Sequence, residues 1–285
     1  MKRSSFGGRL LQVLVFFFLY APIAILIIFS FNSTKGRVWT GFSLQWYNKL
    51  FHNSAILGAL STTLAVSVLA AVIATVAGTF AAIGLYNMKK RPREILLQVS
   101  NIPVINADII TGVSLCLLFV ASCSALGSLN GWINHTFGTN LTTSFSLGFG
   151  TLLLAHISFN IPYVILSVLP KLRQLDQNLF EAARDLGCTW MQALRKVILP
   201  EIRPGIVNGL IMAFTLSIDD FVISYFTAGS RVQTLSMQIY AMTKKRISPE
   251  INAISTLLFT TVLILLVVIN MRQARQEKAL AEKRQ

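Results

Sequence analysis

The stretch "ILGALSTTLAVSVLAAVIATVAGTFAAIGLY", residues 56–86, decides the fold class of this chain. It contains no charged side chain. It is also longer than the roughly 20 apolar residues with which an α-helix crosses a hydrocarbon core of about 30 Å. We therefore expect a transmembrane helix here that is tilted or begins in the outer interface.

Five other runs are mostly apolar and also long enough to cross a membrane. Together, the predicted spans cover residues 10–31, 56–86, 95–121, 147–169, 205–228 and 251–271. The composition agrees, because 54% of the 285 residues are hydrophobic, 13% are charged and the mean hydropathy is +0.63. Such values are too apolar for an ordinary soluble domain. The sequence predicts an all-α polytopic membrane protein, with six transmembrane helices in a single domain over residues 1–285.

The distribution of basic residues predicts the orientation of these spans. The net charge of +14 does not indicate a nucleic-acid partner, because the basic residues lie in short segments between the apolar runs. If the N-terminus is cytoplasmic, the inside segments hold 18 of the 25 Lys and Arg residues and the outside segments hold 7. Both termini are therefore expected in the cytoplasm. Lys244, Lys245 and Arg246 are the exception, since they fall on the outer side.

The first apolar run has a rival interpretation as a cleaved signal peptide, because Lys2, Arg3 and Arg9 precede it. The run is longer than the usual core of a signal peptide, and no small-x-small cleavage site follows it. We expect a retained anchor.

The most informative hydrophilic segment is the long inside loop "KLRQLDQNLFEAARDLGCTWMQALRKVILPEIRP", residues 171–204. It predicts two short helices with a sharp break at Gly187, where a left-handed conformation is least costly. Asn178 is expected to cap the first helix, Thr189 begins a capping box for the second, and Pro200 is expected to stop the second. From the residues alone, this loop could present an apolar surface to a partner or could pack on its own membrane domain.

One motif in this loop carries a resemblance. "EAARDLG", then nine residues, then "VILP" resembles the EAA motif of ABC importer permeases, with the pattern E-A-A-x-x-x-G, nine residues, I-x-L-P. The matching positions are Glu181, Ala182, Ala183, Gly187, Leu199 and Pro200. Val197 stands where the pattern has Ile, which keeps a β-branched apolar side chain.

The resemblance implies that the loop is a coupling helix that docks on a nucleotide-binding subunit. The ATPase-coupling residues that we predict on this basis are Phe180, Glu181, Ala182, Ala183, Gly187, Trp190, Leu199 and Pro200.

The sequence predicts no enzymatic site on the chain itself. No stretch fits the P-loop pattern G-x-x-x-x-G-K-[ST], and Cys116, Cys123 and Cys188 lack the spacing of metal ligands. We therefore expect no catalytic residue, metal or cofactor on this chain. ATP and Mg would be bound by the partner ATPase.

A wider resemblance, to the spermidine/putrescine permease subunits of the ABC family, extends over nearly the whole chain. The stretches that carry it occur in the same order and at similar spacing, and are "YAPIAILIIFSFNSTK" (20–35), "WYNKL" (46–50), "ADIITGVSLCLLFV" (107–120), "AFTLSIDDFVISYFTAG" (213–229) and "SPEINAISTL" (248–257). The outer loop between the third and fourth spans departs from the family, since it is longer and more polar.

This resemblance implies a type I ABC importer permease (MetI-like) fold in the cytoplasmic membrane, with polyamines as the solute. The implied partners are a dimer of ATPase subunits, a second homologous permease subunit, an extracytoplasmic polyamine-binding protein and membrane lipid. Permeases for thiamine or ferric iron share the coupling loop, so those solutes stay open as alternatives.

Three acids lie within the predicted spans: Asp108, Asp219 and Asp220. Each ionised Asp near the bilayer centre costs about 2.5–3.5 kcal/mol, so these side chains must face protein, water or a cation. Acids along a translocation path would attract a polycation, with Tyr225 and Phe226 as cation–π partners.

The adjacent pair has a structural alternative. A helix turns about 100° per residue, so Asp219 and Asp220 cannot both face one path. One of them could cap a break in the helix, with Ser217 and Ser224 as candidate partners of Asp220, and Thr215 of Asp219.

Two other classes of function are weighed against an ABC permease. In a proton-coupled secondary transporter, Asp108, Asp219 and His156 would carry protons, but such a transporter has no use for a coupling loop. A membrane scaffold without transport activity would give the intramembrane acids no task.

Overall fold

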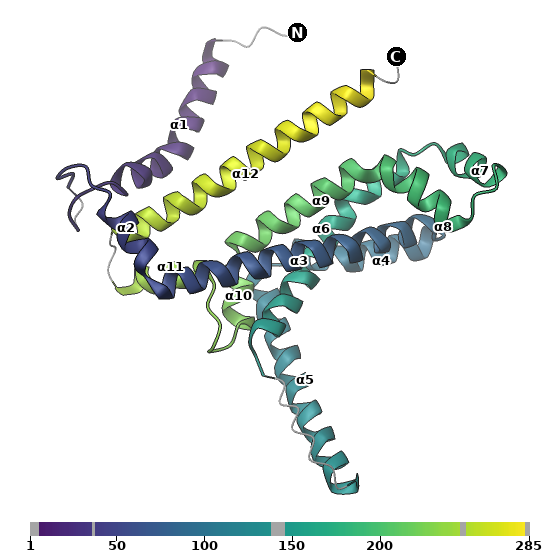
Figure 1. The fold of residues 1–285 in the computed structure, drawn as a ribbon, viewed down its shortest axis with the longest axis horizontal. Coiled ribbons are helices and arrows are strands. Elements are labelled where there is room, and N and C mark those ends of the chain that lie inside the picture. The colour runs from purple at the N-terminus through teal and green to yellow at the C-terminus, as the bar shows by residue number, and fades with distance from the viewer. Residues whose placement is uncertain (1–5, 36–37, 138–145, 246–248, 283–285) are drawn as a thin grey trace. The chain divides into compact units, whose positions relative to one another are not determined.

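The computed structural model describes residues 6–35, 38–137, 146–245 and 249–282, and nearly all of them are helical (Figure 1). Arg246 of the outer basic cluster lies outside these residues. Six helices are long and apolar enough to cross a membrane: Leu10–Phe29, Ser54–Asn87, Asp108–Asn130, Phe149–Arg173, Trp190–Asp219 and Pro249–Val268. The prediction of an all-α protein with six membrane helices is confirmed. The chain divides into two compact units.

The first unit combines the two ends of the chain, residues 1–58 and 238–285. It contains α1 (Phe6–Phe29), α2 (Gln45–His52), most of α11 (Leu235–Lys245) and α12 (Pro249–Glu282). Helix α12 packs against both α1 and α2. This unit therefore holds the first and the last membrane helix.

The connection from α1 to α2 is organised by the buried side chain of Asn32. The Asn32 Oδ1 accepts a hydrogen bond from the Thr40 backbone N–H at 2.9 Å, and the Asn32 backbone carbonyl accepts one from Trp46 Nε1 at 2.6 Å. The Nζ atoms of Lys35 and Lys49 lie 5.7 and 4.9 Å from the centre of the buried Trp46 ring. The ammonium groups of these two lysines thus lie over the ring of Trp46, and Trp46 stabilises the connection from α1 to α2.

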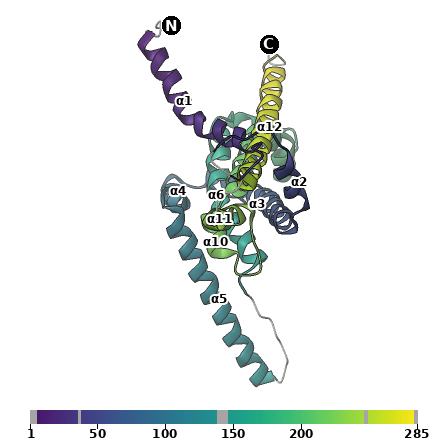
Figure 2. The ribbon, with the colours of Figure 1, turned by 90° about the vertical axis from the view of Figure 1, so that its left-hand side faces the viewer.

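The second unit, residues 59–237, holds the other helices. They are α3 (Ser54–Asn87, from residue 59 on), α4 (Lys90–Ile105), α5 (Asp108–Phe137), α6 (Phe149–Arg173), α7 (Gln177–Asp185), α8 (Trp190–Ala193), the π-helical turn η1 (Leu194–Ile198), α9 (Leu199–Asp219) and α10 (Val222–Thr227). Helix α5 starts against α10 and then extends away from the other helices of its unit (Figure 2).

The core of this unit is the close packing of α3, α6 and α9. Val164 of α6 is buried between Gly78 of α3 and Gly209 of α9. A β-carbon at Gly78 would lie 2.7 Å from Val164 Cβ, and one at Gly209 would lie 3.3 Å from Val164 Cα. Small residues at these positions let the helix backbones approach, which is how membrane helices gain packing contacts.

Two predicted spans are interrupted in the structure. The run 95–121 is divided between α4 and α5, and the extended residue Asn106 (φ −72°, ψ 152°) lies at the break. The run 205–228 is divided between α9 and α10 at Asp220, which is also extended (φ −60°, ψ 128°). Apolar residues continue on both sides of each break, so hydropathy alone does not reveal it.

Candidate functional site

The coupling loop begins with α7 and ends that helix as the sequence predicts. Gly187 has a φ of +86°, the left-handed region that suits glycine. The Cys188 N–H donates to the Ala183 carbonyl at 3.1 Å, and the Gly187 N–H donates to the Arg184 carbonyl at 2.9 Å. These two bonds form a Schellman motif, so the break at Gly187 is fixed by backbone geometry.

The N-terminal cap of α7 differs from the prediction. Asp176, and not Asn178, is the capping residue, and its Oδ1 accepts a hydrogen bond from the Asn178 N–H at 3.0 Å. Both residues are good caps. The helix begins earlier because the Asp176 carboxylate accepts the N–H of Asn178, the second residue of α7.

The second half of the loop is one continuous helical path into the membrane. The Thr189 capping box is present: its N–H donates to Gln192 Oε1 at 3.0 Å, and its Oγ1 accepts from the Gln192 N–H at 3.3 Å. The prediction that Pro200 stops this helix is wrong. The path runs from α8 through η1 into α9, and Pro200, the second residue of α9, lies inside this continuous path directly after the π-helical turn, where the helix lacks the hydrogen bond of one N–H.

The predicted coupling residues lie on different sides of the loop. Ala183 is buried, while Glu181, Ala182, Gly187 and Pro200 are exposed. Phe180 and Leu199 are half-buried, and Trp190 is exposed. Leu186, beside the break, is 86% exposed. We call the turn around Gly187 the knuckle. Its tip, at Leu186, is apolar and exposed.

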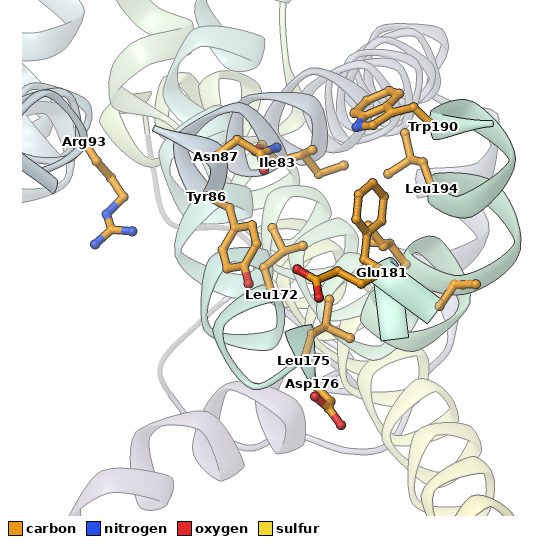
Figure 3. Close-up of a pocket in the computed structure, with 13 residues that line it drawn as sticks. Ile83, Tyr86, Asn87, Arg93, Leu172, Leu175, Asp176, Glu181, Trp190 and Leu194 are labelled. Atoms are coloured by element: carbon orange, nitrogen blue, oxygen red, sulfur yellow. The ribbon is translucent and has the colours of Figure 1, made fainter. Parts of the chain in front are cut away.

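A cavity of about 420 Å³ lies behind the knuckle, between the loop and the ends of α3 and α6 (Figure 3). The Glu181 carboxylate points into the group of lining side chains, near Tyr86 and Leu172 (Figure 3). The other lining residues are Ile83, Asn87, Arg93, Leu175, Asp176, Phe180, Trp190, Leu194, Val197 and Ile198.

At the other end of α9 the two acids point in different directions. Asp219 is exposed, whereas the side chain of Asp220 is only 10% exposed. Asp220 caps α10: its Oδ2 accepts from the Ser224 N–H at 2.8 Å and its Oδ1 from the Ile223 N–H at 3.3 Å. The expectation that one acid caps a break holds for Asp220, through backbone N–H groups and not through the hydroxyls of Ser217 and Ser224.

A buried polar cluster joins α6 to both halves of this interrupted helix. His156 Nδ1 lies 3.1 Å from Ser217 Oγ in α9, and its Nε2 lies 3.1 Å from Ser224 Oγ in α10. Asn160 Nδ2 donates to Ser217 Oγ at 2.8 Å, and Asp220 Oδ2 lies 3.6 Å from His156 Nε2. All these side chains except Asp220 are at least 97% buried. The cluster therefore fixes the angle between α9 and α10.

Sequence reasoning missed Asn160 in this cluster. It follows His156 by four residues, so both lie on one face of α6. That spacing, in an apolar helix, was the available signal. The predicted bond between Asp219 and Thr215 is not formed, since the Thr215 hydroxyl donates to the Ile211 carbonyl at 2.8 Å.

The remaining predicted pathway residues lie on α5 and α10. Asp108 begins α5 and is exposed. One turn later, a β-carbon at Gly112 would lie 3.0 Å from the Phe226 ring, so the start of α5 packs directly on α10. Tyr225 is 52% exposed and stands edge-on to the half-buried Phe226 ring. The exposed groups are thus Asp108, Asp219 and Tyr225.

Comparisons with known proteins agree with this architecture. Residues 74–281 match the family model described as "Binding-protein-dependent transport system inner membrane component". The spermidine/putrescine transport system permease protein PotC of Haemophilus influenzae is 35% identical over 89% of this chain and 91% of its own length. The putrescine transport system permease protein PotI of Escherichia coli is 37% identical over 93% of this chain and 90% of its own length.

Solved structures show the same fold at lower identity. A bacterial ABC transporter involved in the import of the acidic polysaccharide alginate gives a TM-score of 0.68 at 19% identity, over 94% of both chains. The MetNI methionine ABC transporter gives 0.55 at 19% identity, over 80% of this chain and 98% of that chain. The chain therefore belongs to the binding-protein-dependent transport system inner membrane components, the permease subunits of ABC importers.

Proposed function

We propose that this chain translocates polyamines, spermidine or putrescine, as a permease subunit of an ATP-driven importer in the inner membrane. The similarity to two polyamine permeases supports this class of solute. The observation that carries the proposal is the course of α9, a single helix that leads from the EAA motif at Leu199 to the exposed carboxylate of Asp219. A movement of the coupling loop would therefore displace Asp219, because both belong to the same rigid helix α9.

The other subunits follow from this function. Both termini lie in the cytoplasm, and the knuckle of the coupling loop contacts a dimer of ATPase subunits that bind ATP and Mg. A second, homologous permease completes the translocation path. An extracytoplasmic polyamine-binding protein delivers the solute to the outer face.

The coupling loop acts as a rigid knob. Its exposed tip, with Leu186, fits an apolar groove on the ATPase, and the Schellman bonds at Gly187 keep the tip from folding away. The loop connects α6 to α9, which pack along each other. When the ATPase dimer closes, the push on the loop is transmitted to this helix pair as a rigid-body movement.

The path uses the exposed acids. An ammonium group that has lost water requires a counter-charge, which Asp108 and Asp219 provide, while the exposed ring of Tyr225 offers a π-face. Asp220 and Phe226 serve the path indirectly, by holding the break and the α5 contact. Binding along such a path must be weak, because a conduit that binds tightly does not release its solute.

Uptake of labelled spermidine by the complete assembly tests the proposal. We expect excess putrescine to compete and thiamine or ferric iron not to compete. Uptake should persist when the proton gradient is collapsed in ATP-replete vesicles. Competition by thiamine or iron alone would move the chain to another solute within the same family, and loss of uptake with the gradient would favour a proton-coupled transporter.

A further inference from the structure

The cavity behind the coupling loop lies where two membrane helices end. Tyr86 and Asn87 form the last turn of α3, and Leu172 belongs to the last turn of α6. The ends of transmembrane helices mark the level of the lipid headgroups, where tyrosine side chains are enriched. The volume of about 420 Å³ is within the range of small-molecule sites. A headgroup from the adjoining leaflet can therefore reach this cavity.

The cavity carries opposite charges on different sides. Arg93 lines the cavity from α4, and Glu181 of α7 and its capping residue Asp176 line it from the loop. The Nε atom of Arg93 is buried and donates no hydrogen bond to any residue that the structure describes. A buried N–H without an acceptor is unfavourable, and a phosphate oxygen is an acceptor that matches the guanidinium fork. The carboxylate of Glu181 matches an ammonium group in the same way.

Apolar side chains line the cavity and are also exposed on α4. Ile83, Leu175 and Val197 line the cavity itself. After Arg93, α4 exposes Ile95, Leu96 and Val99, which are 62%, 43% and 55% exposed. Of these, Leu96 lies three residues after Arg93, on the same face of α4, and so offers acyl chains an apolar surface next to Arg93.

We propose that the cavity binds the headgroup of an aminophospholipid such as phosphatidylethanolamine, with its phosphate on Arg93 and its ammonium on Glu181. A soluble polyamine would pair with Glu181, but it would leave the Arg93 N–H without an acceptor and would be repelled by its charge. The bound headgroup holds the coupling loop against α3 and α6. Assignment to the cytoplasmic leaflet rests on the proposed orientation, whereas binding of the lipid does not depend on the solute.

Native mass spectrometry of the complete importer tests the proposal. The complex is reconstituted in nanodiscs of phosphatidylethanolamine, phosphatidylcholine or phosphatidylglycerol and then delipidated in steps. We expect phosphatidylethanolamine to be retained longest, because phosphatidylcholine has no ammonium N–H and phosphatidylglycerol has no cation. Arg93→Gln should weaken its retention by about tenfold, the loss expected for one charge-assisted hydrogen bond.

Arg91→Gln is the matched control, since Arg91 is exposed on the same helix and does not line the cavity. It should retain the lipid as the wild type does. Equal retention of the three lipids, or equal loss in Arg93→Gln and Arg91→Gln, would overturn the proposal. Displacement of the lipid by micromolar spermidine would also overturn it, in favour of a soluble polyamine at Glu181. Because the readout is lipid mass, a negative result leaves the proposed transport function untouched.

Discussion

Helix α9 connects two regions that are held together by different means. At its start, the shape of the coupling loop is set by the backbone: the left-handed Gly187, the Schellman bonds and the turn η1. At its other end, the break at Asp220 is set by side chains, with His156, Ser217 and Ser224 buried against one another. A region shaped by backbone should tolerate most side-chain changes except at glycine, whereas a region shaped by buried side chains should tolerate few.

The largest effect is expected from Gly187→Val. A β-carbon at Gly187 meets no neighbouring atom, so the substitution acts through the positive φ alone, which a β-branched residue rarely adopts. The Schellman turn should open, and the ATPase should no longer co-purify while the permease still inserts. Gly187→Asn, which tolerates this conformation, is the control and should retain most of the ATPase. Normal co-purification with the valine variant would contradict a backbone-built knuckle.

The next effect separates the two acids. Asp219→Asn removes an exposed charge and should lower polyamine uptake by about tenfold at unchanged abundance, equivalent to about 1.4 kcal/mol. Asp220→Asn keeps one of the two oxygens that accept N–H groups of α10 and removes no exposed charge, so it should reduce uptake less. Labelled uptake, normalised to the amount of permease in the membrane, measures both. If both variants transport polyamines as well as the wild type does, neither acid serves the path and both are structural.

A third substitution tests the side-chain cluster. His156→Leu removes the contacts to Ser217 and Ser224 and leaves their hydroxyls with fewer partners in a buried site. The free energy of unfolding should fall by about 2 kcal/mol, within the range for buried polar groups that lose partners. Thermal unfolding in detergent measures this loss, with Ser128→Ala on the exposed part of α5 as a control. An unchanged unfolding temperature would mean that packing alone holds the break.

The smallest effect is expected from Thr189→Ala. The substitution removes one hydrogen bond of the exposed capping box and should cost about 1 kcal/mol of local helix stability. Hydrogen exchange over residues 189–193 should become faster, while ATPase co-purification stays normal because Gly187 is intact. Loss of the ATPase in this variant would show that side chains, too, shape the knuckle.

The same contrast explains what could be predicted from the sequence. The break at Gly187 and the Thr189 capping box depend on residues within five positions of each other, so short patterns reveal them. The cap of α7 shifted by two residues because Asp176 and Asn178 compete for the same role. The interpretation of Pro200 was wrong because a proline has the same appearance in sequence whether it ends a helix or follows a π-helical turn within a continuous one.

The contacts at the other end of α9, around Asp220, were harder to predict because they join residues that are distant in sequence. His156 and Ser224 are 68 residues apart, and Asn160 reaches Ser217 across 57 residues. Helical geometry predicted that the two acids would diverge. Which acid turns inward depends on His156, a partner on another helix, and no local pattern contains that information.

The turn η1 has a consequence for insertions and deletions. In η1 the Leu199 N–H donates to the Leu194 carbonyl, five residues earlier, so this turn holds one residue more than an α-helical turn. Deleting one residue from 194–198 would therefore restore a regular α-helix with little rotation of the knuckle, whereas deleting one residue from the α-helical part of this path would rotate the knuckle about the helix axis by about 100° relative to the membrane segment. The spacing of nine residues within the EAA motif thus has an angular meaning: it sets the direction in which the loop faces the subunit that drives it.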